Sequence, residues 1–226
     1  PQTQKSIFLH WFEGIRMSID EQSMSDLPIG KSFEDPSHES QYIFRQILKS
    51  MSEPGRIVTL NTQIVPPPPL SIATAAICLS LLDFETKLWI DSSLDTDEAK
   101  QYLKFHTGLK IADQPQQANF CILGTQIPNL DLFNSGTEDY PENGATLIIQ
   151  TDEITDQAQL QLEGPGIETS RHLSIGAINK RFWANRDNLQ SLFPRGLDFI
   201  FTQNDITVSL PRTTKVTVLK TQLNGY

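Results

Sequence analysis

Residues 86–124 read TKLWIDSSLDTDEAKQYLKFHTGLKIADQPQQANFCILG, and this stretch decides the fold class. Residues 86–91 form a strand pattern, residues 95–106 an amphipathic helix with a charged face, and residues 119–123 a second, apolar strand. Gly108 is the residue type that ends helices in a left-handed conformation. A strand, a helix and a strand in succession are typical of parallel pairing, so the stretch predicts an α/β fold.

Two more helices are predicted upstream. The first begins at Asp35-Pro36, where an aspartate cap precedes a proline suited to the first turn, and it ends before Pro54-Gly55. A short strand at residues 57–60 follows. The tetraproline 66–69 is open to two interpretations, a spacer between domains or a stiff connector within one, and its reach of about 12 Å favours the connector. Residues 70–82 then predict a buried helix rich in Ala, Ile and Leu.

Downstream of Ala145 the pattern changes to short strands separated by turns. Strand patterns occur in ATLIIQT (145–151), QLQLEG (159–164) and ETSRHLSI (168–175), and a helix follows before Pro194. These elements predict a mixed sheet flanked by helices, with an antiparallel C-terminal part. We expect a single α/β domain over residues 31–226 and an N-terminal extension over residues 1–30, with a short helix around 8–17.

The composition excludes several classes of function. The formal charge of −9, with scattered basic residues, disfavours nucleic acid as a partner, because such binding needs clustered positive charge. No apolar segment is long and uninterrupted enough to span a membrane, and the first residues lack the pattern of a secretory signal. We therefore expect a cytoplasmic protein. Cys78 and Cys121 stand far apart in apolar runs, which predicts buried, reduced thiols.

Two arginines are the leading candidates for a binding site. In FPRGLDFIFTQNDITVSLPRTTKV (193–216), a turn at Gln203-Asn204 would place Arg195 opposite Arg212 at the open end of a hairpin, and a turn shifted by one residue would leave the two arginines diagonal neighbours. Like charges in that position need a carboxylate or a bound anion between them. The pair is therefore either a clamp for a phosphate or phosphonate, or a set of structural ion pairs with acidic groups of this chain or of a partner subunit.

Weaker candidates lie elsewhere in the chain. Glu138 and Glu142, together with Asp139, form a carboxylate-rich loop that either binds Mg²⁺ or is a solvated turn. His106 lies near the end of a helix, where capping explains it as well as catalysis does. No His/Cys cluster predicts a metal site, and no motif for a nucleophile or a phosphate-binding loop is present, so the catalytic residues stay unknown.

Seven stretches of the sequence, taken together in this order, resemble a known family. They are FRQILKSMSEPGRI (44–57), LSLLDFET (79–86), FHTGLKIA (105–112), GTEDYPENGATLII (136–149), LEGPGI (162–167), FPRGLDFIF (193–201) and LPRTTKV (210–216). The chain resembles the PhnH family, the H subunit of the carbon-phosphorus lyase system of phosphonate metabolism. The resemblance covers residues 33–218 and carries nothing onto residues 1–30.

The resemblance implies a place in a multiprotein assembly. The implied partners resemble the G, I, J and K subunits, and H with G, I and the accessory L protein exchanges the adenine of ATP for an alkylphosphonate. The product is a ribose 1-alkylphosphonate 5-triphosphate, and ATP and Mg²⁺ are substrates of the whole assembly. The radical J subunit then cleaves the C–P bond. A chain with only Cys78 and Cys121 lacks the cysteine cluster of such chemistry, so it is not the lyase itself.

The implied fold is similar to the large domain of pyridoxal-phosphate (PLP)-dependent transferases, without the cofactor. No lysine stands in a setting that marks a Schiff base, and Lys215 is expected to be a strand residue. Three roles stay open: a scaffold subunit, a substrate-binding subunit of the transferase, and a stand-alone phosphate-anion or nucleotide-binding protein. We also expect the isolated chain to form a homodimer through exposed sheet edges and apolar patches.

Overall fold

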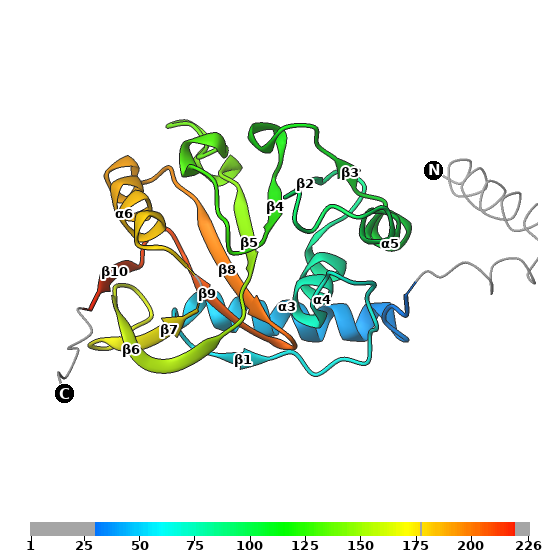
Figure 1. The fold of residues 1–226 in the computed structure, drawn as a ribbon, viewed down its shortest axis with the longest axis horizontal. Helices are drawn as coiled ribbons and strands as arrows, with labels where there is room; N and C mark the ends of the chain where they lie inside the picture. Colours follow the sequence, from blue (N-terminus) through cyan, green and yellow to red (C-terminus); the bar gives the residue numbers. More distant parts are fainter. Residues whose placement is uncertain (1–29, 177, 220–226) are drawn as a thin grey trace, which may run out of the picture.

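The computed structural model describes residues 30–176 and 178–219, and its centre is a seven-stranded sheet (Figure 1). The strand order is β1-β9-β8-β5-β4-β2-β3. Neighbouring strands from β8 to β3 pair in parallel, whereas β9 runs antiparallel to both β8 and β1. The strands are β1 (Val58–Thr59), β2 (Lys87–Ile90), β3 (Lys110–Ile111), β4 (Phe120–Leu123), β5 (Thr146–Gln150), β8 (Asp198–Gln203) and β9 (Ile206–Leu210). The mixed α/β architecture expected from residues 86–124 is confirmed.

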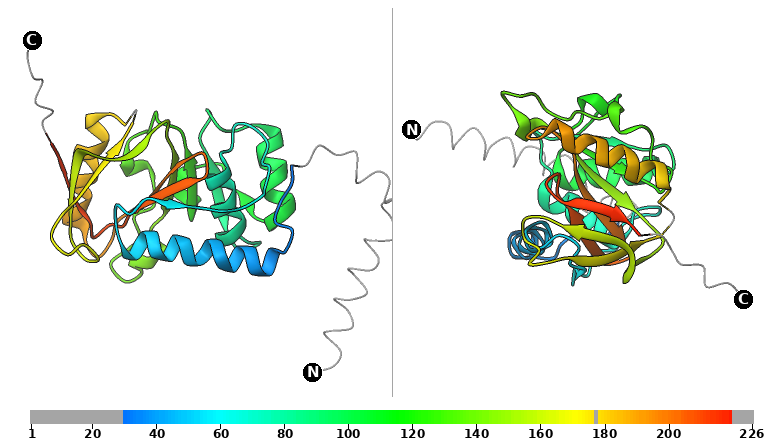
Figure 2. Two further views of the ribbon diagram at one scale, coloured as in Figure 1. Left: turned by 90° about the horizontal axis from the view of Figure 1, so that it is seen from below. Right: turned by 90° about the vertical axis from the view of Figure 1, so that its left-hand side faces the viewer.

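Both faces of this sheet are covered. One face packs against α3 (Pro36–Ser52), α4 (Ile72–Leu81) and α5 (Asp97–Thr107), and the other against α6 (Lys180–Leu189) and a second, smaller sheet (Figures 1 and 2). Alternate strand residues point to opposite cores: Ile122 and Ile148 face the first, and Cys121 and Leu147 the second. Strands buried on both faces read as continuous apolar runs, which explains their sequence pattern.

The helix ends agree with the sequence. The side chain of Asp35 caps α3 by accepting a hydrogen bond from the backbone N–H three residues later. The side chains of Ser71 and Thr96 accept the corresponding hydrogen bond at the starts of α4 and α5. Gly108 ends α5 with φ of 73°. The described residues also form the 3₁₀ turns η1 (Pro115–Gln117), η2 (Leu130–Leu132), η3 (Pro141–Asn143) and η4 (Gln190–Leu192). No helix within residues 30–219 is both long enough and apolar enough to cross a membrane.

The antiparallel strands do not all join the main sheet, which corrects the expectation of one mixed sheet. β6 (Ile154–Glu163), β7 (Arg171–Ile175) and β10 (Lys215–Val218) form a separate sheet of order β10-β6-β7. Leu160, Leu162 and Leu173 of this sheet pack into the same core as α6, so burying them requires a layer stacked on the main sheet.

The predicted register of the C-terminal hairpin is wrong. The turn residues are Asn204 and Asp205, and Phe199 pairs with Leu210, so Arg195 does not face Arg212. Asn204 has φ of 50°, the left-handed conformation that asparagine adopts more readily than glutamine does. The turn therefore lies one residue later than predicted, which changes every cross-strand pair.

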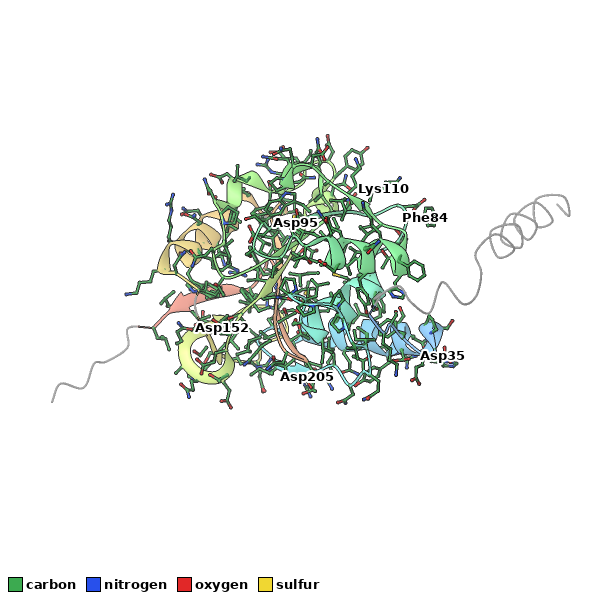
Figure 3. All side chains as sticks on the ribbon, turned by 45° about the vertical axis from the view of Figure 1, so that its right-hand side comes forward. Asp35, Phe84, Asp95, Lys110, Asp152 and Asp205 are labelled. Atoms are coloured by element: carbon green, nitrogen blue, oxygen red, sulfur yellow. The ribbon has the colours of Figure 1, made fainter. Side chains whose placement is uncertain are left out.

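The acidic residues are dispersed over the surface. Figure 3 shows Asp35, Asp95, Asp152 and Asp205 on different parts of the molecule. The predicted helix around residues 8–17 lies outside the described residues, as does most of the N-terminal extension.

Candidate functional site

Arg212 joins three segments at the end of the sheet where β5 and β8 begin. Its backbone N–H donates to Asp198 Oδ1 at 2.8 Å, and its Nη2 donates to Asp198 Oδ2 at 2.6 Å. Its Nη1 donates to the carbonyl oxygens of Pro141 at 2.7 Å and Pro194 at 3.3 Å. The two charged side chains are only 16% and 18% exposed. Because the guanidinium already has a carboxylate and two carbonyls, Arg212 serves to hold these loops together.

Two glycines make this close approach of loops possible. A Cβ on Gly144 would collide with the Gly196 carbonyl oxygen and lie 3.0 Å from Arg212 Nη2. Gly196 has φ of 152°, and its N–H donates to the Ser135 carbonyl at 2.9 Å. The second glycine of GTEDYPENG, Gly144, and the glycine of FPRG, Gly196, are therefore required by packing around Arg212.

The outer side of this junction carries exposed side chains. We call it the Arg212 corner and define it as residues 138–142 and 193–196. Tyr140 and Phe193, the residues before the two prolines held by Arg212, are 60% and 64% exposed. Arg195 is partly exposed, and its guanidinium makes no hydrogen bond or ion pair within residues 30–176 and 178–219. Exposed aromatic and arginine side chains are the types that are enriched in protein interfaces.

The carboxylates of the corner are solvated. Glu138 and Glu142 are both exposed, and Glu142 borders a shallow cavity with Asp83 and Glu85. Among the described residues, no group of three His, Cys, Asp or Glu side chains is placed to hold a metal ion.

His106 lies far along the sheet from the corner, in the last turn of α5 (Figure 1). Its ring packs edge-on against Tyr102 and Phe105, with centroid distances of 4.8 and 5.0 Å. Burial lowers its pKa, and its Nε2 is buried with no hydrogen-bond partner among the described residues. The structure therefore does not bring His106 together with the arginines.

A buried arginine that the sequence did not single out supports the corner from inside. Arg186 of α6 is 3% exposed, donates to the carbonyls of Thr214 at 2.9 Å and Pro211 at 3.0 Å, and lies 5.4 Å from the centre of the Phe199 ring. Burial lowers its pKa to about 10. Only its position in α6, on the face opposite the solvent, could have indicated this role.

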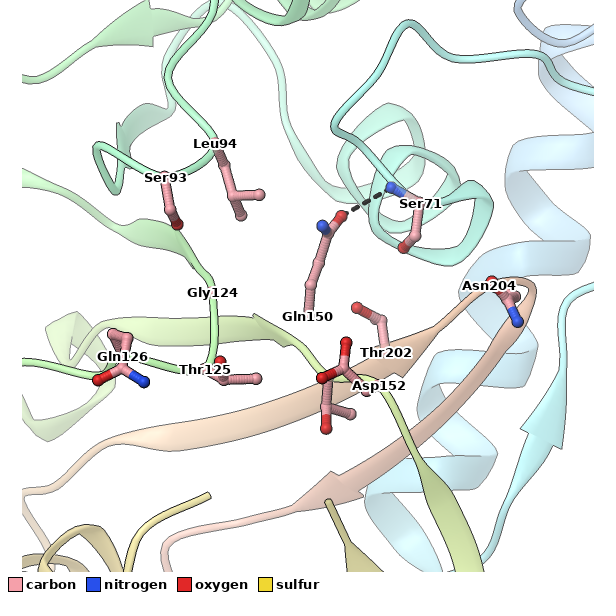
Figure 4. Close-up of a pocket in the computed structure, with 11 residues that line it drawn as sticks. Ser71, Ser93, Leu94, Gly124, Thr125, Gln126, Gln150, Asp152, Thr202 and Asn204 are labelled. Carbon is pink, nitrogen blue, oxygen red and sulfur yellow. Dashed lines mark hydrogen bonds between the residues drawn. The ribbon is translucent and has the colours of Figure 1, made fainter. Parts of the chain in front are cut away.

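The opposite end of the sheet contains a polar pocket of about 350 Å³ that the sequence reasoning missed (Figure 4). It lies where β2, β4, β5 and β8 end, the edge at which open α/β sheets bind ligands. The available signal was a run of polar residues directly after apolar strands, as in Gly124-Thr125-Gln126. The lining residues are Ser71, Ser93, Leu94, Gly124, Thr125, Gln126, Gln150, Thr151, Asp152, Thr202 and Asn204.

Hydrogen bonds connect one wall of this pocket to the start of α4. Gln150 Oε1 accepts from the Ser71 backbone N–H at 2.7 Å, and its Nε2 donates to the Pro69 carbonyl at 3.0 Å. Ala73 N–H donates to the Asn204 carbonyl at 2.7 Å. This wall is therefore preformed by contacts within the chain.

The comparisons with known proteins agree with each other. The family model described as "Bacterial phosphonate metabolism protein (PhnH)" matches residues 31–217. A protein of Rhizobium meliloti (strain 1021), the "Alpha-D-ribose 1-methylphosphonate 5-triphosphate synthase subunit PhnH", is 32% identical over 190 residues, which cover 82% of this chain and 94% of that protein. The "Putative C-P lyase subunit protein HtxG" of Stutzerimonas stutzeri is 27% identical over 182 residues, 78% of this chain and 85% of that protein.

The chain belongs to the PhnH family. The structure now explains three of the stretches that carried the resemblance. In this PhnH-family chain, residues 136–149, 193–201 and 210–216 lie apart in the sequence and meet at the Arg212 corner. The match ends within β10 and leaves out residues 1–30, as expected from the motifs.

Proposed function

We propose that this chain is the H-type subunit of a carbon-phosphorus lyase core complex. Its role is in the step that transfers the ribose triphosphate of ATP to an alkylphosphonate and releases adenine. The supporting relatives are named as a subunit of a ribose 1-methylphosphonate 5-triphosphate synthase and as a putative C-P lyase subunit. The partners in this proposal resemble the G, I, J and K subunits, and ATP and Mg²⁺ are substrates of the assembly.

The Arg212 corner is the observation that favours a scaffold role over catalysis. A largely buried ion pair and two close-packed glycines hold its backbone, yet Tyr140 and Phe193 are exposed on its outer side. A rigid surface that displays aromatic rings loses little conformational entropy on binding. In our proposal this corner contacts another subunit, and Arg195 pairs there with a partner carboxylate.

The resemblance to the large domain of PLP-dependent transferases belongs to the same proposal. The mixed seven-stranded sheet with helices on both faces and the pocket at the carboxyl ends of its strands are compatible with it, although open α/β folds in general share these features. No lysine lines that pocket among the described residues, which favours action without PLP. Cytoplasmic location and a homodimer of the isolated chain are further parts of the proposal.

Affinity capture from phosphate-starved source cells tests this function. Tagged protein is expected to retain subunits resembling G, I and J, identified by mass spectrometry. The double variant Tyr140→Ala/Phe193→Ala should lose them, whereas Phe84→Ala, which removes a ring that is 67% exposed outside the corner, should retain them. Capture of none of these subunits by the unchanged chain would instead support a stand-alone anion- or nucleotide-binding protein.

A further inference from the structure

We propose that the pocket at the carboxyl ends of β2, β4, β5 and β8 binds the hydroxyl groups of a ribofuranosyl group. The choice of ribose among sugars rests on the proposed function, because the related R. meliloti subunit takes its name from a ribose compound. The chemical class of the ligand rests on the pocket alone.

Four polar side chains of the pocket have unused hydrogen-bonding capacity. They are the Thr125 hydroxyl, the Gln126 and Asn204 amides and the Asp152 carboxylate, and none makes a side-chain hydrogen bond within residues 30–176 and 178–219. They come from three different strand ends and line the same pocket (Figure 4). Hydroxyls and amides both donate and accept, as sugar hydroxyls do.

Asp152 gives the pocket its selectivity. A carboxylate only accepts hydrogen bonds, and its two oxygens can receive both hydroxyls of a vicinal diol. An acidic residue after a strand binds the ribose hydroxyls in dinucleotide-binding folds by the same chemistry. Asp152 is the second residue after the end of β5, and no cationic side chain lies among the pocket residues described. Its free charge also repels phosphate.

The other parts of a nucleotide do not fit this pocket. Within the part of the chain that the structure describes, no Lys or Arg lines it to neutralise a triphosphate. The N–H groups of Ser71, Ala73 and Thr74 at the start of α4 are already bonded within the chain. Of the described residues that line the pocket, Leu94 is the single large apolar one and none carries an aromatic ring that could stack on a base. The pocket therefore holds the sugar while phosphates and base extend outside it.

The test uses saturation-transfer NMR on the isolated full chain with methyl β-D-ribofuranoside as the probe. We expect transfer to the sugar-ring protons, weaker transfer to the 2-deoxy analogue, and no displacement by inorganic tripolyphosphate. Asp152→Asn should weaken binding about tenfold, since a charge-assisted hydrogen bond is lost. Thr125→Val should also weaken it. The matched control is Asp187→Asn, the same chemical change on an exposed residue of α6 that lies outside both the pocket and the Arg212 corner.

The inference is overturned if the ribofuranoside shows no transfer at tens of millimolar, if tripolyphosphate displaces it, or if Asp152→Asn and Asp187→Asn bind equally well. A circular dichroism spectrum and a urea titration verify that each variant is folded. Subunit capture by the same preparations separates the two proposals. If the chain captures the other subunits but does not bind the sugar, the pocket inference alone is refuted. If it binds the sugar but captures no subunit, the proposed assembly is refuted and the inference that the pocket binds a sugar still holds.

Discussion

Arg212 and Asp198 close the open end of the β8–β9 hairpin by an ion pair that also includes the Arg212 backbone N–H. Three hydrogen bonds from the guanidinium reach the Asp198 carboxylate, at 2.6, 3.1 and 3.3 Å. Arg195 takes no part in this ion pair and has no other ion pair among the described residues. The two arginines that looked equivalent in the sequence therefore have different environments and should respond differently to substitution.

Arg212→Ala is expected to lower the free energy of unfolding by about 3 kcal/mol, because it leaves Asp198 largely buried without its partner. Arg195→Ala should change it by less than about 0.5 kcal/mol, as surface substitutions do. Urea titrations of both variants measure this difference. Equal effects would show that the ion pair does not stabilise the corner.

Gly144→Ala should destabilise the chain by about 1–3 kcal/mol, because the new methyl group meets a backbone oxygen that cannot move alone. The neighbouring variant Asn143→Ala adds no atoms at an exposed position and should lie within about 0.5 kcal/mol of the parent. Thermal unfolding of the two variants compares them directly. A stable Gly144→Ala protein would mean that the two loops separate without cost.

Gln150→Leu is expected to cost about 1–3 kcal/mol, since the Ser71 N–H and the Pro69 carbonyl both lose their partner. Gln150→Glu keeps an acceptor for Ser71 but, when ionised, has no donor for Pro69. The free energy of unfolding that Gln150→Glu loses should therefore be partly recovered as the pH falls, because the protonated carboxyl group can again donate to the Pro69 carbonyl. Urea titrations at pH 7 and pH 5 measure this, and identical values at both pH would contradict the role of the donor.

Cys78 and Cys121 should react with a thiol reagent at pH 8 only when the protein unfolds, because burial raises the pKa of each to about 12. Rates of labelling with and without urea check this. Rapid labelling of the native chain would contradict the burial of these thiols.

The same thiols predict a pH dependence of stability. Their pKa is raised in the folded state, so the unfolded chain releases these protons first and stability falls as the pH rises above about 9. Burial lowers the pKa of Arg186 to about 10, which acts in the opposite direction, but this effect is common to the parent chain and to Cys78→Ala and cancels when the two are compared between pH 8.5 and 10. Cys78→Ala should reduce the slope of stability against pH in this window, whatever its effect on packing. An unchanged slope would mean that the Cys78 thiol titrates alike in both states.

Local patterns predicted the helices well, because the caps act on nearby backbone: Asp35 and Gly108 lie where the sequence placed helix ends. The hairpin register was wrong because one left-handed residue, Asn204, decides it and several residues near the turn were compatible with a two-residue loop. The separate small sheet was missed because alternation in β6 shows which side chains are buried but not which layer buries them.

The sequence by itself determined the fold class, the acidic surface and the family, since strand–helix alternation, charge and ordered motifs are all properties of short segments. Only the tertiary structure decided what the candidate residues contact. Arg212 meets Pro141 across 71 positions, and Gln150 meets Ser71 across 79. Pairings over such separations depend on how the layers pack, and no local spacing encodes that.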